Sequence, residues 1–323
     1  MDFLLKSAIC LPSTVSMDTK KWLTWNQDEA LGRALKRYGK TLKQLEGDIQ
    51  TIKDWMKTQH HLPELGSDGL IKNFLLGNKL SIEQTKEKVD MYYTIRHMMP
   101  EVYDHSNINK PQMKKIADQL YFFPLPKRTE EGSRVTVCKL MDTSSDNFDF
   151  YKFLAYGCSN MEVRFQEDLL YDEIIVIDLE NVKMGHIFKS SPFHLKKMLT
   201  ILEKVYSNKL KKIHMVNCPT FAVNTINALK QLIKPKLASR IFVHEGTETL
   251  SNHISVKVLP GDYHGLELSL QELNEMWKIK LQDHKDRFDV LDNLRTNESL
   301  RPSALQNDEI LGYHGNFRKL SLD

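Results

Sequence analysis

The chain has 323 residues, of which 41% are hydrophobic and 27% are charged, and its formal net charge is +3. This composition is typical of a soluble globular protein with room for two modest domains, and so small a charge argues against nucleic acid as a partner. The four cysteines are far apart and form no CxxC pair, which favours reduced thiols in a cytosolic protein. No run approaches the roughly 20 apolar residues of a membrane span, so we expect any membrane contact to be peripheral.

Helical patterns fill the first hundred residues, where we predict helices over residues 28–38, 41–58, 70–76 and 81–100. In the second of these, apolar residues recur at intervals of three and four and form one apolar face. Ser81 with Gln84 has the pattern of a capping box at the start of the fourth. Residues 1–100 are therefore predicted to form a small all-α domain, in which no residue pattern looks catalytic.

The pattern changes after residue 100. An extended apolar segment at 122–126 and a predicted strand at 134–140 precede a predicted helix over 148–170. Three short apolar runs follow at 174–179, 213–216 and 241–243, separated by predicted helices at 192–206 and 221–238. Strands alternating with helices indicate βαβ units and a parallel sheet. We predict one domain over 101–281, closed by a helix at 266–281, and a charged tail over 282–323 that is extended or mobile.

The parallel-sheet segment also has an unusual charge distribution. Between residues 204 and 244 there are eight cations and no acidic residue, so the rest of the chain sums to −5. An apolar core with a basic surface suggests an apolar ligand and an anionic surface as partners, although a solvated helix face would give the same pattern. Four methionines in or near this segment suit an adaptable pocket or an ordinary core. They are Met161, Met184, Met198 and Met215.

Signatures of catalysis are weak. The sequence contains no GxGxxG, P-loop, HExxH or GxSxG motif. His186, His214 and His244 lie near the ends of predicted strands and, with Cys218, could imitate a nucleophilic site. Asp178 with Glu180 could be an acid/base pair. Hydrogen-bonded histidines, a buried thiol and turn-forming carboxylates are the simpler interpretation, so we expect no enzyme activity, no metal and no cofactor.

Several ordered motifs resemble the CRAL-TRIO lipid-binding family. They are IIVIDLEN (174–181), KIHMVNCP (212–219), RIFVH (240–244) and VLPGDYHG (258–265). The similarity extends over about residues 25–280 and is greatest to members related to α-tocopherol transfer and retinaldehyde-binding proteins. The ending GNFRKL (315–320) resembles the tails of arthropod members.

This resemblance implies a mixed, largely parallel sheet with flanking helices, forming the floor of a closed apolar cavity under a mobile gate helix at about residues 217–240. It implies a carrier of one hydrophobic molecule of the tocopherol, retinoid or carotenoid class, exchanged at membranes that contain phosphoinositides. The alternative is a phosphoinositide-sensing adaptor without transfer activity. The positions that would line the cavity are Leu154, Gly157, Met161, Ile175, Ile177, Val182, Met184, Ile187, Met198, Ile201, Leu202, Tyr206, Ile213, Leu229 and Ile233.

The same resemblance assigns the phosphoinositide headgroup to Lys209, Lys211, Lys236 and Arg240. Two departures modify that expectation. The family's arginines are replaced around residues 76–78 by Leu-Gly-Asn, and the gate's customary Lys-Pro pair is absent, with Pro235 one turn later. Because proline ends or kinks a helix, we predict a bend near Pro235. We expect a cytoplasmic monomer that associates only transiently with membranes.

Overall fold

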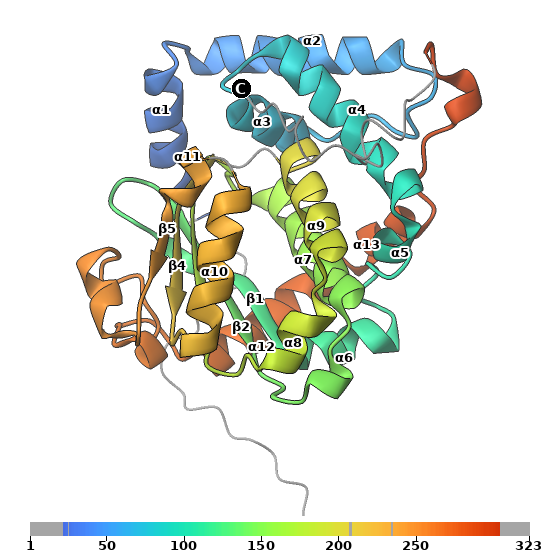
Figure 1. Ribbon diagram of the computed structural model, residues 1–323. Helices are drawn as coiled ribbons and strands as arrows, with labels where there is room; N and C mark the ends of the chain where they lie inside the picture. The colour runs from blue at the N-terminus through green and yellow to red at the C-terminus, as the bar shows by residue number, and fades with distance from the viewer. Residues whose placement is uncertain (1–21, 25, 207–208, 234, 304–323) are drawn as a thin grey trace, which may run out of the picture.

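The structure is a computed structural model of the chain, and it describes residues 22–24, 26–206, 209–233 and 235–303. Helices of the N-terminal part lie across one end of the molecule, and a sheet with its flanking helices forms the rest (Figure 1). The N-terminal helices are α1 (Gln27–Arg37), α2 (Leu42–Lys57), α3 (Asp68–Gly77) and α4 (Ile82–Met98). All four were predicted within a few residues of these bounds.

Side-chain caps explain where these helices begin. Thr41 Oγ1 accepts the backbone N–H of Gln44, whose side chain accepts the N–H of Thr41 in return, so the full capping box lies at α2. At α4, Ser81 Oγ accepts the N–H of Gln84 at 3.4 Å, which is one half of the predicted box. Two short helices then lead into the sheet, α5 (Pro100–Tyr103) and α6 (Pro111–Gln119).

Five strands form one sheet in the order of the chain. They are β1 (Leu120–Arg128), β2 (Arg134–Leu140), β3 (Asp172–Asp178), β4 (Lys209–Val216) and β5 (Ile241–Val243). The pair β1–β2 is antiparallel and the other pairs are parallel, so the sheet is mixed and largely parallel, as predicted. Pro124 and Pro126 are accommodated because β1 is an edge strand, where a missing N–H leaves no neighbour unpaired.

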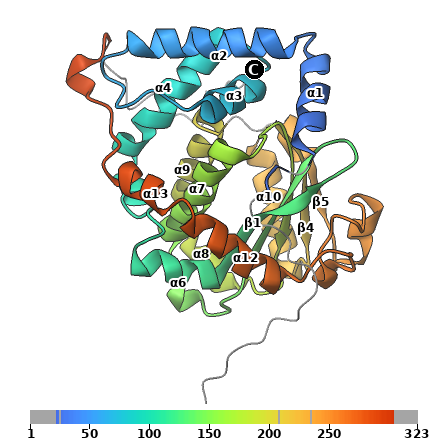
Figure 2. The same ribbon diagram turned by 180° about the vertical axis from the view of Figure 1, so that it is seen from behind.

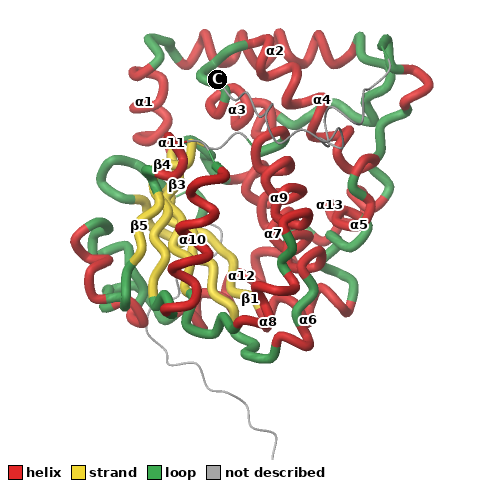
Figure 3. Tube along the Cα trace, in the orientation of Figure 1, coloured by secondary structure: helices red, strands yellow, loops and turns green. Residues whose placement is uncertain are grey.

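The crossover helices share one face of this sheet because successive parallel connections in one direction are right-handed. They are α7 (Phe150–Glu167), α8 (Met184–Lys189), α9 (Pro192–Lys204), α10 (Thr220–Leu232) and α11 (Pro235–Ala238). Figure 3 shows α10 in front of the strands, with α7 and α9 beside it. Helix α12 (Leu270–Gln282) packs near β1 on the side seen in Figure 2.

The predicted bend of the gate segment is confirmed. Helix α10 ends at Leu232, and Ile233 has the extended backbone angles φ −105° and ψ 164°. Pro235 then begins α11, a position where its fixed φ and missing N–H are tolerated.

The prediction for the tail was wrong for residues 285–292, which form α13 (Lys285–Asp292). Phe288 and Leu291 of this helix are buried. The guanidinium of Arg287 forms hydrogen bonds of 2.9 and 2.6 Å with the carboxylate of Glu64, and Arg301 pairs with Asp90 at 2.7 Å. These contacts with the N-terminal helices hold a charged segment in place. The GNFRKL motif lies outside the described residues.

A buried ionic cluster joins α7 to the first two strands. Asp168 is fully buried and contacts Arg128 at 2.5 Å, Arg134 at 2.8 Å and Arg164 at 3.0 Å. The three guanidinium groups offset the cost of burying that carboxylate and hold its pKa well below the usual range. Other contacts cross the predicted boundary at residue 100, such as the bond of 2.5 Å from Tyr92 Oη to Glu162. The division at residue 100 remains a prediction.

Candidate functional site

One face of the central strands is incompletely covered. In β3, Ile174 and Val176 are buried at 5% and 0% exposure, whereas Ile175 and Ile177, which alternate with them, are only partly buried. In β4, Ile213 is likewise only partly buried. Neighbouring side chains of a strand point to opposite faces, so the partly exposed residues share a face. Central parallel strands are normally buried on both sides, which makes this face a candidate binding surface.

The strand register shows how far the apolar surface extends. Partners across a ladder lie side by side on one face, and two rows of such partners cross the sheet. The first row is Phe122, Cys138, Ile177, Met215 and Val243, and the second is Pro124, Thr136, Ile175, Ile213 and Ile241. Thr136 contributes the one hydroxyl group of the two rows. We call these two rows the apolar sheet face.

Helix α7 borders this face through its only glycine. A Cβ atom added to Gly157 would meet Phe122 at 3.8 Å and no other atom within 4 Å apart from its immediate surroundings in the helix. Leu154, one turn earlier, is only partly buried and packs against the core. Helix α7 therefore leaves space beside Phe122 where a side chain would otherwise stand.

Ile175, Ile177 and Ile213 lie on the apolar sheet face and Gly157 lies beside it, and the predicted lining residues as a set differ in burial. Those partly buried are Leu154, Gly157, Ile175, Ile177, Val182, Ile187, Met198, Ile213 and Ile233. Met184 and Leu202 are exposed, whereas Met161, Ile201 and Tyr206 belong to the buried core. The side chain of Leu229 lies outside the described residues. Ligand contact by any of these residues remains a prediction.

The sequence patterns did not single out two apolar residues of the sheet face and two exposed phenylalanines on the helices α8 and α9. Phe122 and Ile241 enter through the strand register. Phe188 of α8 and Phe193 of α9 are 76% and 48% exposed, which is unusual for phenylalanine. Met215, one of the four methionines noted in the sequence, lies on the apolar sheet face. A separate surface hollow of about 310 Å³ lies beside β1, lined by residues such as Lys127, Ser255 and Leu266, and none of the predicted lining residues borders it.

The four predicted headgroup cations gather at the amino ends of β3, β4 and β5, but two of them pair with a buried carboxylate. Lys209 Nζ lies 3.4 Å and Lys211 Nζ 3.1 Å from the buried carboxylate of Asp172, which also pairs with Arg37 at 3.3 Å. The strand register places Asp172 directly beside Lys209. Lys209 and Lys211 therefore have a structural role in addition to any contact with lipid.

The remaining two cations differ in exposure. Lys236 is exposed on α11, and Arg240 is partly buried, with its guanidinium donating to the carbonyl of Leu210. Where the family carries arginines, Leu76 and Asn78 are buried, and Asn78 Nδ2 donates to the carbonyl of Phe74 at 2.8 Å. Those two side chains present no cation to a membrane.

Asp178 has the local role that its position after a strand suggests. Its carboxylate accepts hydrogen bonds from the N–H of Glu180 at 3.0 Å, Asn217 Nδ2 at 2.9 Å and Tyr263 Oη at 3.0 Å. Lys139 Nζ lies 2.9 Å from it. A buried carboxylate with four partners organises a turn, so the simpler interpretation of Asp178 is confirmed.

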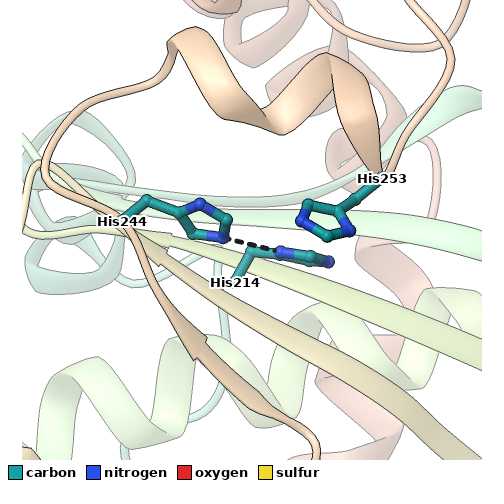
Figure 4. A group of neighbouring side chains, drawn as sticks. All are labelled: His214, His244 and His253. Carbon is teal, nitrogen blue, oxygen red and sulfur yellow. Dashed lines mark hydrogen bonds between the residues drawn. The ribbon is translucent and has the colours of Figure 1, made fainter.

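The histidines do not assemble a nucleophilic site with Cys218. His214 Nδ1 and His244 Nε2 are 2.9 Å apart, and His253 lies beside them (Figure 4). His186 lies elsewhere, where its Nδ1 accepts the N–H of Lys183 at 2.9 Å. The thiol of Cys218 contacts its neighbouring carbonyl at 3.8 Å, and burial raises its pKa, which disfavours the thiolate.

Among the described residues, no helix combines the length and the apolar character needed to cross a bilayer. The mixed sheet, its crossover helices and the preceding helical part match two family models. One, described as a Pinta-like UBA domain, matches residues 41–113, and the other, described as a CRAL/TRIO domain, matches residues 118–265. Residues 118–265 therefore match the CRAL/TRIO domain family, as the sequence motifs predicted.

Individual relatives are distant. An alpha-tocopherol transfer protein-like protein of Mus musculus is 23% identical over 272 residues, which are 81% of this chain and 78% of the relative. Clavesin-1 of Xenopus laevis is 22% identical over 228 residues, which are 68% of each chain. Among solved structures, one titled "Crystal structure of Sfh5" covers 81% of this chain and 99% of its own, with 13% identity and a TM-score of 0.45.

Proposed function

We propose that this protein is a carrier that binds one hydrophobic molecule between the apolar sheet face and α10, and exchanges it at membranes. The observation that carries the proposal is the partial exposure of Ile175, Ile177 and Ile213 on strands in the centre of a parallel sheet. A protein that had no ligand to accommodate would gain stability by covering these side chains. The relatives named for α-tocopherol transfer support the same class of ligand.

The energetics suit a tocopherol, retinoid or carotenoid. A ligand that buries about 400 Å² of apolar surface gains roughly 10 kcal/mol at about 25 cal/mol per Å², before the entropy cost of binding. A molecule of that kind is almost insoluble in water, so exchange requires direct transfer from a bilayer. The break between α10 and Pro235 supports α10 as the element that moves.

Membrane contact is proposed at the amino ends of the strands. Each cation near an anionic leaflet contributes about 1 kcal/mol. We expect Lys236 and Arg240 to contribute more than Lys209 and Lys211, because the last two are paired with Asp172. We further propose that the protein is a cytoplasmic monomer that associates transiently with membranes and has no enzyme activity.

A vesicle-to-vesicle transfer assay tests this function. Wild-type protein should move a fluorescent tocopherol or retinoid analogue between vesicles, and Ile177→Trp should lose most of that activity because the indole fills the apolar sheet face. Leu42→Trp is the matched control, since Leu42 is exposed on α2 and away from the sheet. Equal transfer by wild type and Ile177→Trp would contradict the proposed location of the ligand.

The same vesicles distinguish a carrier from an adaptor. We expect the double variant Lys236→Ala/Arg240→Ala to bind phosphoinositide vesicles roughly tenfold or more weakly. Lys114→Ala/Lys115→Ala removes two exposed cations from α6 and should leave binding unchanged. Vesicle binding by the wild type without any transfer would instead support a phosphoinositide-sensing adaptor.

A further inference from the structure

Three imidazoles meet on the opposite side of the sheet from the apolar sheet face. His214 belongs to β4, His244 follows β5, and His253 follows the 3-10 helix η3 (Glu248–Asn252). Their potential ligand nitrogens all lie within 4.8 Å of one another. The ring centroids are 5.2 Å apart for His214–His244, 4.9 Å for His214–His253 and 5.6 Å for His244–His253. Figure 4 shows the three rings close together, with His244 and His253 on either side of His214.

The strand register explains this meeting. His214 is beside Val176 and Phe242 in the ladder, so it points away from Ile213 and its neighbours. The N–H of His244 donates to the carbonyl of Met215 at 2.8 Å, which fixes His244 at the end of the parallel pair. The segment after β5 then folds back and brings His253 over the ring of His214.

One buried nitrogen of the cluster lacks a hydrogen-bond partner in the described part of the chain. His214 Nε2 is buried and has no hydrogen-bond partner among the described residues. A buried polar atom without a partner is costly, and it is uncommon unless a ligand or water completes it. His244 Nδ1 lies 2.7 Å from Thr249 Oγ1, a contact that orients the ring and leaves Nε2 facing His214. Ligand histidines are commonly held in this way by a partner on the second nitrogen.

The dimensions are close to those of a zinc site. Tetrahedral Zn²⁺ binds imidazole nitrogen at about 2.0–2.1 Å, which separates two ligand nitrogens by about 3.3 Å. The hydrogen-bonded pair, His214 Nδ1 and His244 Nε2, stands at 2.9 Å, and one nitrogen can be chosen from each of the three rings so that all three lie within 4.8 Å of one another. His253 is exposed, so its side chain can adjust and solvent can supply a fourth ligand.

We propose that His214, His244 and His253 bind one divalent transition metal ion, with Zn²⁺ as the preferred ion because three imidazoles and an open fourth position suit it. The ion would fasten the segment after β5 to β4. The site is separate from the apolar sheet face and does not depend on the proposed carrier function. The competing explanation is aromatic packing, since His214 also stacks on Phe242 with centroids 5.2 Å apart.

Metal titration of the full chain, prepared without a histidine tag and stripped with EDTA, tests this site. Calorimetry with Zn²⁺ should give one ion per chain, and His253→Ala should weaken binding at least tenfold. His97→Ala is the matched control, because His97 is also exposed but lies on α4. Absence of Zn²⁺ binding by the wild type, or equal affinity in His253→Ala, would overturn the proposal.

A second measurement keeps the test independent of the stability of any variant. In imidazole nitrogen spectra of the wild type, Zn²⁺ should shift the signals of His214, His244 and His253 and leave the other histidines unchanged. Co²⁺ in place of Zn²⁺ should give the visible absorption of a tetrahedral site without a thiolate band. Shifts confined to other histidines, or a thiolate band, would refute the assignment.

Discussion

Gly157 permits a test in which stability and binding should change in opposite directions. It lies within α7, where glycine is less favourable than alanine by roughly 1 kcal/mol. A Cβ at this position meets only Phe122, at 3.8 Å, so Gly157→Ala should raise the free energy of unfolding of the ligand-free protein by about 0.5–1 kcal/mol. Gly157→Phe should also fold, because its ring enters space beside the apolar sheet face.

The phenylalanine ring should exclude the ligand from that space. A buried ring covers at least about 150 Å², and a ligand that gives up this area loses about 4 kcal/mol, or roughly a thousandfold in Kd. Urea unfolding followed by circular dichroism and titration with a fluorescent retinoid measure the two effects.

Gly69 of α3 is the matched control for this test. A Cβ there would stand 2.8 Å from the carbonyl oxygen of Gln166, so Gly69→Ala should destabilise the protein by about 1–3 kcal/mol. Loss of stability in Gly157→Ala, or unchanged ligand affinity in Gly157→Phe, would refute the proposed space beside α7.

Three further predictions concern buried and partly buried charges. Asp168→Asn leaves three buried arginines without their carboxylate and should cost about 3–5 kcal/mol in urea unfolding; a cost below about 1 kcal/mol would contradict the buried cluster. For His284, burial lowers the pKa, but the hydrogen bond to Glu167 outweighs it and the net pKa is raised. The stability that this pair contributes is therefore full below about pH 6.5 and is lost as the pH rises through the raised folded pKa. His284→Gln should flatten the pH dependence of unfolding above about pH 6.5, and an unaltered profile would refute the pairing. Lys211→Ala should lower stability by up to about 1 kcal/mol, since Asp172 keeps other partners, and should weaken vesicle binding less than Lys236→Ala; the reverse order in flotation assays would contradict the internal pairing.

Local features of the chain were predictable from sequence because their causes are local. The break before Pro235 follows from the geometry of proline, and the start of α2 follows from its cap. Helix α13 was missed for the opposite reason. Its sequence is charged and offers few apolar residues, and it is held by contacts such as Arg287 to Glu64, 223 residues away in the chain.

The candidate sites depend on pairings that spacing does not reveal. The run at 174–177 is apolar throughout, so only the structure distinguishes the buried Val176 from the partly exposed Ile175. Nothing in the sequence around Lys209 predicts that the strand register places Asp172 beside it. His253 lies beside His214 because the segment after β5 folds back over the sheet. No sequence motif predicts the course of that segment.

Native mass spectrometry of the full chain, isolated without detergent and paired with organic extraction, tests the carrier function most directly. The account predicts a chain with one apolar molecule bound, and a Gly157→Phe variant that is largely empty. Wild-type protein that is isolated empty and takes up neither tocopherol, retinoid nor carotenoid from vesicles would contradict it.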